Sequence, residues 1–310
     1  MKDQKWWALA PSLGIVNKDK PSDIKYMEKI TLNNGVIMPT LGIGTFLISP
    51  PDAFNGVKEA LKMGYRHIDT ANMYGNERAV GRAIKESGVP RNEIFLATKI
   101  WPTEYHNPNI VEETLERLGV DYVDLLYVHQ PAGDWKACYK MIEKAYKEGK
   151  TKAIGISNME GHWLDELYSF CEIKPQVIQV ECHPYFPQTE LREQIKKDDI
   201  KIVSWFPLGH GDPSLLNEEV ITEIAKKHGV TNVQVLLRWQ LDMGFIVIPG
   251  SKNVDHIKDN FDILKFKLDD EDMKKIATLN KNKKYNQQTP EKLEVYANRF
   301  PVYEKEATDL

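Results

Sequence analysis

Cysteine is scarce in this chain of 310 residues, and its few cysteines follow no recognisable spacing. Cys138, Cys171 and Cys182 are scattered and odd in number. A disulfide framework needs an even, clustered set, and a zinc site built on cysteines needs paired CxxC spacing, so the sequence indicates neither. Free thiols suit a reducing compartment, which predicts a cytoplasmic protein.

The chain also lacks a long apolar run and an excess of charge of either sign. No stretch approaches the length of a transmembrane helix, and the apolar patch at residues 6–10 is followed at once by Pro11, too early for a secretion signal. The formal net charge is -4, with 42% hydrophobic and 28% charged residues, as in ordinary globular proteins. We therefore expect no binding to nucleic acid and no association with membranes.

A glycine-rich phosphate loop is absent as well. Gly42-Ile43-Gly44 is followed by Thr45-Phe46 and does not complete the G-x-G-x-x-G pattern of doubly wound dinucleotide-binding sheets. The sequence contains instead a regular alternation of short apolar segments and amphipathic helical segments. Continuous apolar strands are typical of a parallel sheet covered on its outside, and repeated right-handed crossovers close such a sheet into a barrel.

The fold class predicted from this alternation is α/β, a (β/α)8 TIM barrel preceded by an N-terminal β-hairpin. The hairpin covers 30–39, where Asn34-Gly35 favours a type I′ turn with positive φ at both residues. Eight strands are expected, at 41–46, 65–71, 94–100, 123–129, 152–157, 177–182, 200–205 and 245–248. The helices between and after them are expected at 53–63, 77–86, 110–118, 136–147, 161–170, 188–197, 218–228, 232–241 and 254–261. Around the barrel domain, 27–280, we expect an extension at 1–26 and a C-terminal tail at 281–310 that shapes the substrate pocket.

Polar residues gather where the expected strands end, which is the end of a barrel that carries chemistry. Lys99 closes one strand, and a buried lysine is unusual unless it is paired. Asp69, at the end of an earlier strand, is the obvious partner. Tyr74 lies in the loop five residues after Asp69, and a charged Lys99 beside it would lower the pKa of the phenol. Taken alone, Asp69 and Tyr74 fit a shared cleft and a purely structural role equally well; in the structural role Asp69 is a satisfied buried carboxylate and Tyr74 an exposed loop tyrosine.

Seven motifs in this order are specific to one family. Residues 26–280 resemble the aldo-keto reductases, in particular NADP(H)-dependent members like bacterial 2,5-diketo-gluconate reductase and aldose reductase. The matching segments are 64–77 (GYRHIDTANMYGNE), 97–101 (ATKIW), 127–131 (YVHQP), 155–158 (GISN), 179–184 (QVECHP), 207–209 (PLG) and 248–251 (IPGS).

The resemblance implies an oxidoreductase that reduces aldehydes or ketones to alcohols by hydride transfer from NADPH. Its catalytic tetrad falls on Asp69, Tyr74, Lys99 and His129 without substitution. Tyr74 is implied to be the general acid that protonates the carbonyl oxygen, and Lys99, held by Asp69, to lower the pKa of Tyr74. His129 is implied to orient and polarise the carbonyl.

The resemblance also implies a cofactor site. Its residues are Gly44, Thr45, Ser157, Asn158, Gln179, Trp205, Leu208, Asp212, Ser251, Lys252, Asn253, His256 and Asn260. Trp205 stands where many members carry a tyrosine stacked under the nicotinamide, with plain core packing as the alternative. Gly250 and His256 replace the lysine and arginine that commonly clasp the 2′-phosphate. Lys252 is the nearby substitute, so we expect NADPH to be preferred by a reduced margin, with use of NADH as the alternative.

The substrate side is expected to be aromatic, with Phe46, Trp101 and Trp135 supplied by three loops. The partner is a small carbonyl compound, and we expect a monomer or a weak dimer. Two other functions stay open at this point. One is a redox-sensing, cofactor-binding subunit on the same fold with little turnover. The other is a metal-dependent barrel hydrolase, although the run Glu181, Cys182, His183 is a poor ligand set because adjacent strand residues point to opposite faces, so no metal site is assigned.

Overall fold

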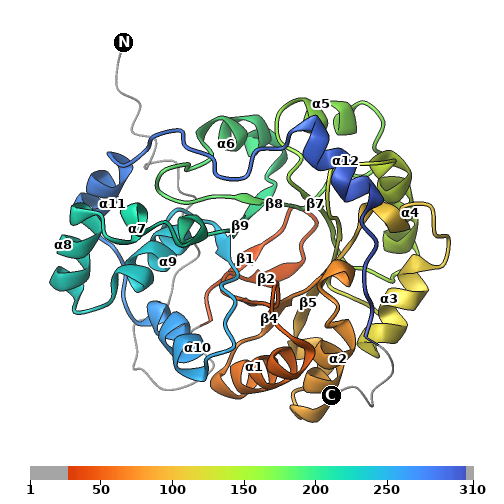
Figure 1. Cartoon of the computed structure of the whole chain (residues 1–310), viewed down its shortest axis with the longest axis horizontal. Helices are drawn as coiled ribbons and strands as arrows, with labels where there is room; N and C mark the ends of the chain where they lie inside the picture. Colours follow the sequence, from red (N-terminus) through yellow and green to blue (C-terminus); the bar gives the residue numbers. More distant parts are fainter. Residues whose placement is uncertain (1–26, 305–310) are drawn as a thin grey trace.

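A ring of eight parallel strands forms the centre of the computed structural model, which describes residues 27–304 (Figure 1). The strands are β3 (Ile43–Gly44), β4 (His67–Asp69), β5 (Phe95–Ile100), β6 (Leu125–Val128), β7 (Ile154–Ser157), β8 (Val177–Glu181), β9 (Lys201–Trp205) and β10 (Ile246–Val247). Each pairs with its neighbour along the chain. A parallel bridge between Leu41 and Val247 joins the first strand to the last, which confirms the predicted TIM barrel. The expected extension at 1–26 lies outside the described residues.

Helices surround the ring in the predicted order. They are α1 (Pro50–Met63), α2 (Glu77–Glu86), α3 (Ile110–Leu118), α4 (Trp135–Lys147), α5 (His162–Tyr168), α6 (Thr189–Ile195), α8 (Glu219–His228), α9 (Asn232–Asp242) and α10 (Val254–Phe261). Their ends follow local chemistry. At α1, for example, the Ser49 side chain accepts from Asp52 N, and Gly64 ends the helix with φ 113°. Three further helices were not predicted, α7 (Pro213–Leu216), α11 (Asp270–Ala277) and α12 (Pro290–Asn298).

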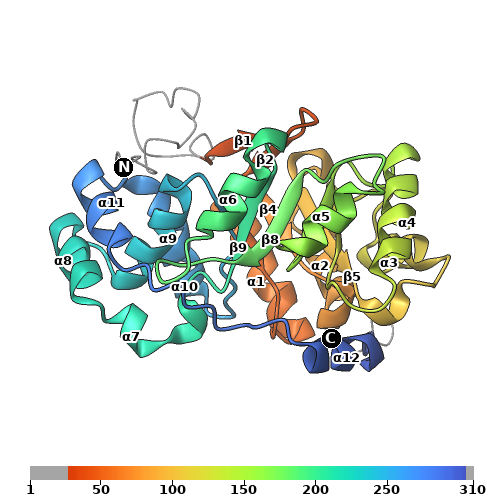
Figure 2. The same ribbon diagram turned by 90° about the horizontal axis from the view of Figure 1, so that it is seen from above.

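The N-terminal hairpin closes the end of the barrel opposite α12 (Figure 2). Strands β1 (Lys29–Thr31) and β2 (Ile37–Pro39) pair antiparallel, as predicted. The type I′ turn is wrong, because Gly35 is at positive φ (87°) and Asn34 is not. Gly35 N donates to Leu32 O and Leu32 N donates to Val36 O, both at 2.8 Å, so the loop has three residues with the glycine last.

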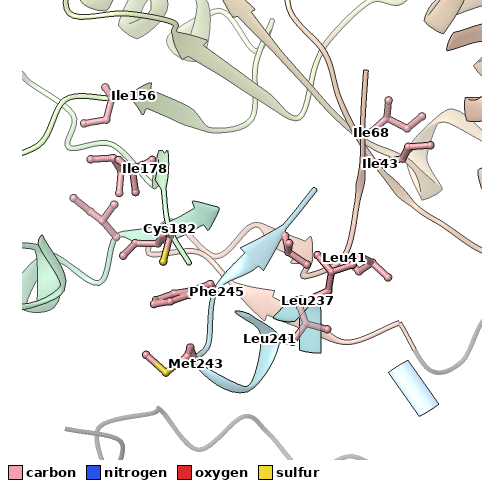
Figure 3. Packing of buried hydrophobic residues seen from close by; sticks show 14 of the residues in the cluster. Leu41, Ile43, Ile68, Ile156, Ile178, Cys182, Leu237, Leu241, Met243 and Phe245 are labelled. Atoms are coloured by element: carbon pink, nitrogen blue, oxygen red, sulfur yellow. The ribbon is translucent and has the colours of Figure 1, made fainter. Parts of the chain in front are cut away.

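Two layers of apolar side chains hold the barrel together. The inner layer fills the ring, and the hairpin residues Ile30, Leu32 and Met38 close it at the end opposite α12. The outer and larger layer lies between strands and helices, and Figure 3 shows one part of it, where Leu237 and Leu241 of α9 lie beside Leu41. Burial of each such side chain contributes roughly 1.5–3 kcal/mol to the stability of the fold. The ring is therefore a rigid frame for the residues at the carboxyl ends of its strands. Within residues 27–304, no helix is long and apolar enough to cross a membrane.

Candidate active site

The alternation of side chains along the strands determines which residues face the carboxyl end of the ring. In β5, Phe95 and Ala97 belong to the inner core, and Lys99 is the next residue on the same face. In β6 the inward row runs through Tyr127, and His129 follows it directly after the strand. The same alternation therefore places an apolar layer inside the ring and, two residues further towards the carboxyl ends of the strands, a polar layer.

Lys99 is the centre of that polar layer. Its side chain is fully buried, and Nζ donates to Asp69 Oδ1 and to Thr70 O at 2.9 Å. Gln179 Nε2 donates to the other oxygen, Asp69 Oδ2, at 3.0 Å. This geometry confirms the predicted pairing of Lys99 with Asp69.

The pair shifts the pKa of both partners. Burial by itself would lower the pKa of Lys99, but the charge of Asp69 and the hydroxyl of Tyr74 raise it above its ordinary value. Burial raises the pKa of Asp69, against the opposing effects of Lys99 and Gln179. Lys99 is therefore a cation throughout the neutral range.

Tyr74 lies at the end of the short helix η3 (Asn72–Tyr74), which Gly75 terminates with φ 65°. Its hydroxyl accepts from Lys99 Nζ at 3.3 Å, and Nζ lies 4.9 Å from the centroid of the phenol ring. Burial raises the pKa of Tyr74, and Lys99 opposes that rise without reversing it. The expected direction of Lys99's effect is right, but the expected net lowering of the phenol pKa is wrong for this structure, because desolvation is the larger contribution. The phenol is protonated at neutral pH and can donate.

His129 is 6% exposed and follows β6, which β5 separates from β4, and its ring faces that of Tyr74. The ring centroids of His129 and Tyr74 lie 5.7 Å apart in an edge-on arrangement, and those of His129 and Trp101 lie 4.9 Å apart. Burial, together with the charge of Lys99, holds the pKa of His129 well below its usual value. The imidazole is therefore neutral, so it can orient a carbonyl by one N–H without adding a charge.

A buried hydrogen-bond network that the sequence did not reveal fixes the base of the Tyr74 loop. The Thr45 hydroxyl lies 2.9 Å from Thr70 Oγ1 and 3.2 Å from Asn76 Oδ1. Asn76 Nδ2 donates to Thr45 O and Ile48 O, both at 2.9 Å. Thr45, predicted to contact the cofactor, thus uses its hydroxyl to join the first two strand ends.

The residues predicted to hold the nicotinamide carboxamide come together on neighbouring strands, with Ser157 opposite Gln179. Asn158 has φ 60°, and its Nδ2 donates to Gln130 Oε1 at 3.2 Å and to Ser157 Oγ at 3.3 Å. Trp205 Nε1 donates to Asn158 Oδ1 at 3.0 Å, which fixes the indole at the end of β9. Gln130 is a member of this group that sequence reasoning missed.

Leu208 and Asp212 lie in the loop after β9, at the edge of the site. The Asp212 carboxylate accepts from Ser214 N at 2.8 Å and from Lys283 Nζ at 3.0 Å, and it also binds the hydroxyl of Tyr285. These contacts hold the pKa of Asp212 well below its usual range, with the Tyr285 hydroxyl as the largest cause. The loop is tied to the C-terminal tail, a connection that no local pattern indicated.

The predicted phosphate-binding residues stand at the N-terminus of α10. Ser251 Oγ accepts from Asn253 N at 3.0 Å, and Asn253 Oδ1 caps the helix through Asp255 N at 2.9 Å. Lys252 and His256 are exposed, while Asn260 is 8% exposed on the inner side of the helix.

Gly250 is one departure from the family pattern, and the close approach of two backbone segments explains it. A Cβ at this position would lie 2.7 Å from Gly44 O, and a Cβ at Gly44 would lie 2.7 Å from Ile248 O. The backbones that follow the first and last strands therefore meet so closely that no side chain fits at either position without movement. The lysine that the family resemblance implies at this position therefore has no room here.

Two of the three predicted substrate residues lie beside the tetrad. Phe46 is 50% exposed, with its ring centroid 5.1 Å from that of Tyr74. Trp101 packs on His129, and its Nε1 donates to Arg299 O in the C-terminal tail at 2.7 Å. Trp135 does not join this aromatic wall. It is the first residue of α4 and packs in the hydrophobic core against Phe170, with centroids 5.6 Å apart.

The carboxylate considered above as a metal ligand has protein partners. Glu181 Oε1 lies 2.9 Å from His183 Nε2 and also accepts from Tyr285 N at 2.7 Å, while Oε2 accepts from Asn286 N at 2.8 Å. These bonds lower the pKa of Glu181 although burial opposes them. Glu181 is thus a structural anchor for the segment that leads to α12.

Comparison with known proteins gives one consistent result. The model of the family described as "Aldo/keto reductase family" matches residues 39–281. A protein named glyoxal reductase from Bacillus subtilis (strain 168) is 45% identical over 269 residues, covering 85% of this chain and 96% of that protein. A protein named glycerol 2-dehydrogenase (NADP(+)) from Saccharomyces cerevisiae is 40% identical, covering 82% of this chain and 91% of the relative. The crystal structure of an aldo-keto reductase enzyme from a Medee basin deep-sea metagenome library superposes with a TM-score of 0.80 at 44% identity, covering 83% of this chain and 97% of that one.

Proposed function

The chain belongs to the aldo/keto reductase family and is an oxidoreductase that reduces carbonyl compounds, and we propose that Tyr74 is the acid that protonates the carbonyl oxygen. One observation carries this proposal. The buried Lys99 ammonium is held between the Asp69 carboxylate and the Tyr74 hydroxyl, 3.3 Å from the latter. A cation in that place stabilises the phenolate left behind when the proton leaves, which makes a protonated, buried phenol a usable acid.

The residues around Tyr74 and Lys99 have supporting roles in the reduction. Asp69, itself held by Gln179, keeps Lys99 charged and aimed at the phenol. His129 is neutral, so its N–H can fix the carbonyl oxygen near the Tyr74 hydroxyl while the charge of Lys99 remains the dominant field. Phe46 and Trp101 flank the same place with aromatic surface, which suits an apolar part of the substrate.

The residues present fit a nicotinamide cofactor. Ser157, Asn158 and Gln179 put buried polar groups at neighbouring strand ends, and Trp205 presents an indole fixed by Asn158. These would hold the carboxamide and the ring, and the cofactor supplies the hydride when bound. Leu208 and Asp212 would line the middle of the cofactor, and Asn260 would lie near its adenine end.

We propose that NADPH is preferred to NADH, by a smaller margin than the family usually shows. The yeast relative whose name includes NADP(+) supports the choice. Lys252 and the amides at the start of α10 are the groups available for a 2′-phosphate, because Gly250 has no side chain. The relative named glyoxal reductase supports a small aldehyde as substrate. We further propose that the protein is cytoplasmic, because its three cysteines are free. We also propose that it is a monomer or a weak dimer.

The test is turnover by the purified protein. Oxidation of NADPH or NADH is followed by absorbance with glyoxal, 4-nitrobenzaldehyde and a panel of ketones. We expect steady aldehyde-dependent oxidation that is faster with NADPH. Tight cofactor binding without turnover on any carbonyl compound would point to a redox-sensing subunit and contradict the proposal.

A further inference from the structure

The helix that follows the Tyr74 loop has lost its local cap. Helix α2 begins at Glu77, and Asn76 occupies the capping position. The Asn76 side chain is used elsewhere, on Thr45 O and Ile48 O. An uncapped helix start leaves several backbone N–H groups without partners, and a capping oxygen typically contributes about 1 kcal/mol.

The missing cap comes from the other end of the chain. The Glu304 carboxylate accepts from Arg78 N at 2.6 Å and from Ala79 N at 3.1 Å, which are amides of the first turn of α2. A negative charge at this place also complements the partial positive charge of the helix N-terminus. Burial raises the pKa of Glu304, and the two amides act against that rise, as expected for a half-buried carboxylate held by backbone donors.

The residues before Glu304 contact the other side of the same loop. Asn72 Nδ2 donates to Tyr303 OH at 3.4 Å, and the Tyr303 ring lies 4.2 Å from the guanidinium carbon of Arg117. Gly75, at positive φ, packs so closely under Val302 that a Cβ there would lie 2.7 Å from the Val302 carbonyl oxygen.

Arg117 ties this contact to the frame of the barrel. Its Nε donates to Glu77 Oε2 at 2.7 Å, and Thr98 Oγ1 of β5 donates to Glu77 Oε1 at 2.6 Å. Tyr303 thus packs on a buried ion pair between α2 and α3, and Thr98 hydrogen-bonds the same pair from β5. The loop from Asn72 to Asn76 is held by this network and by Thr45 on its inner side, and by the tail on its outer side.

We propose that Tyr303 and Glu304 are positioning residues for the reduction, a tail clamp that keeps the Tyr74 hydroxyl at Lys99. The proposal rests on the proposed role of Tyr74 as the acid. Tyr74 lies between the two points that the clamp touches, Asn72 and the first turn of α2. Opening the clamp frees the loop to carry the hydroxyl away from Lys99, and displacements of about 1 Å are enough to cost large factors in rate.

The tail has a second anchor at α12. The contacts of Glu304 can therefore be removed without detaching the rest of the tail. Trp101 Nε1 donates to Arg299 O at 2.7 Å, and the rings of Trp101 and Tyr296 in α12 pack with centroids 5.1 Å apart. In Figures 1 and 2 the blue segment after α11 crosses the end of the barrel and reaches α12. Residues 302–304, the tip of the tail, follow α12. A change at Glu304 therefore releases the tip while α12 stays docked.

The experiment compares Glu304→Ala and Glu304→Gln in the full chain with Glu294→Gln, which removes the same charge from an exposed position of α12. Hydrogen exchange of the amides at 72–79 reports the clamp itself, and kcat measured well below the melting temperature reports Tyr74. For Glu304→Ala we expect exchange at Arg78 and Ala79 to rise about tenfold, in line with the loss of charge-assisted bonds. We also expect kcat to fall roughly three- to tenfold while the Kd of the cofactor stays within about twofold.

Glu304→Gln keeps one acceptor and should recover most of kcat, whereas Glu294→Gln should resemble wild type in both measurements. Faster exchange with an unchanged kcat would show that the tail only caps α2, and unchanged exchange would show that there is no clamp. Either result overturns the proposal. Hydrogen exchange needs no turnover, so a wild-type protein without reductase activity would refute the proposed function while leaving the test of the clamp itself intact.

Discussion

Around Lys99 the charged groups are buried and paired with one another, whereas Lys252 and His256, near the start of α10, stand at the surface. The Ser251 and Asn253 side chains beside them bond only to their own loop and helix. Both regions lie at strand ends of the same ring, and both were predicted from the same family motifs. The first has its partners built in, and the second offers backbone amides and one exposed lysine.

The two regions therefore differ in how many substitutions they tolerate. A proton donor works only if its pKa and its position are fixed, so the groups around Tyr74 depend on one another and tolerate little substitution. A phosphate grip at the surface relies on exposed charges that act nearly alone, so its residues can be exchanged with small effects.

Lys99→Met should cause the largest loss. It removes the cation beside Tyr74 and leaves the buried Asp69 with Gln179 alone. Breaking a buried ion pair by removing one partner typically costs roughly 3–5 kcal/mol of stability. We expect kcat to fall by about 10³ or more, on the scale of a lost acid or its activating charge. Urea unfolding measures the first effect and single-turnover kinetics the second. A variant with near wild-type kcat would remove Lys99 from the mechanism.

Asp69→Asn should cause a smaller loss with a characteristic pH dependence. Burial lowers the pKa of Lys99 and Asp69 raises it, so without the carboxylate that pKa falls and Lys99 loses its proton at a lower pH. We expect kcat to fall roughly 10–100-fold at neutral pH and the alkaline limb of the pH–kcat profile to move to lower pH. Profiles of both proteins under conditions where hydride transfer limits the rate provide the check. A limb that stays in place would contradict the role assigned to Asp69.

Gly250→Ala should destabilise the protein although the position belongs to the adaptable region. The added Cβ would lie 2.7 Å from Gly44 O, and a backbone oxygen cannot turn aside as a side chain can. We expect a loss of roughly 1–3 kcal/mol, as for other overpacked sites. Gly250→Lys, which restores the family's common residue, should lose as much stability without a gain in NADPH preference. Denaturant curves and the kcat/KM ratio for the two cofactors measure both claims.

Lys252→Ala should leave folding and kcat with NADH unchanged and reduce the preference for NADPH by about tenfold, the value of one charge-assisted bond. Lys258→Ala is the matched control, because Lys258 is exposed on the same helix and pairs with Asp262 at 3.6 Å instead. The ratio of kcat/KM for NADPH and NADH is measured in all three proteins. If it is the same in all three, Lys252 is not the phosphate ligand.

The strands were predictable because they depend on local sequence. The pairing of Lys99 with Asp69, 30 residues apart, was predictable because strand ends meet at one end of a barrel and a buried lysine needs a partner. Side chains on a strand alternate, so the positions of Lys99 and His129 two residues above the inner core follow from the period alone. The helix bounds at α2 and α3 follow from equally local signals. The net pKa of Tyr74 was not predictable, since the cost of burying the phenol depends on the surrounding structure.

What the sequence could not show are contacts between distant segments. Glu304 caps α2 across 226 residues, and Tyr285 reaches Asp212 across 73. Asn76 carried the usual signal of a helix cap, but its side chain bonds Thr45 O and Ile48 O instead. Trp135 begins a helix, where periodicity does not yet decide between the site and the core, and it faces Phe170. Each of these depends on which surfaces meet after folding.

The most direct test of the central claim is the rate of hydride transfer in Tyr74→Phe, measured in a single turnover with bound NADPH and a reactive aldehyde. The variant keeps the ring that packs against Phe46 and His129 and removes only the hydroxyl that Lys99 contacts. We expect the rate to fall by about 10²–10⁴ while the Kd of NADPH stays within about twofold. A variant that keeps more than about a tenth of the wild-type rate would contradict the assignment of Tyr74 as the acid.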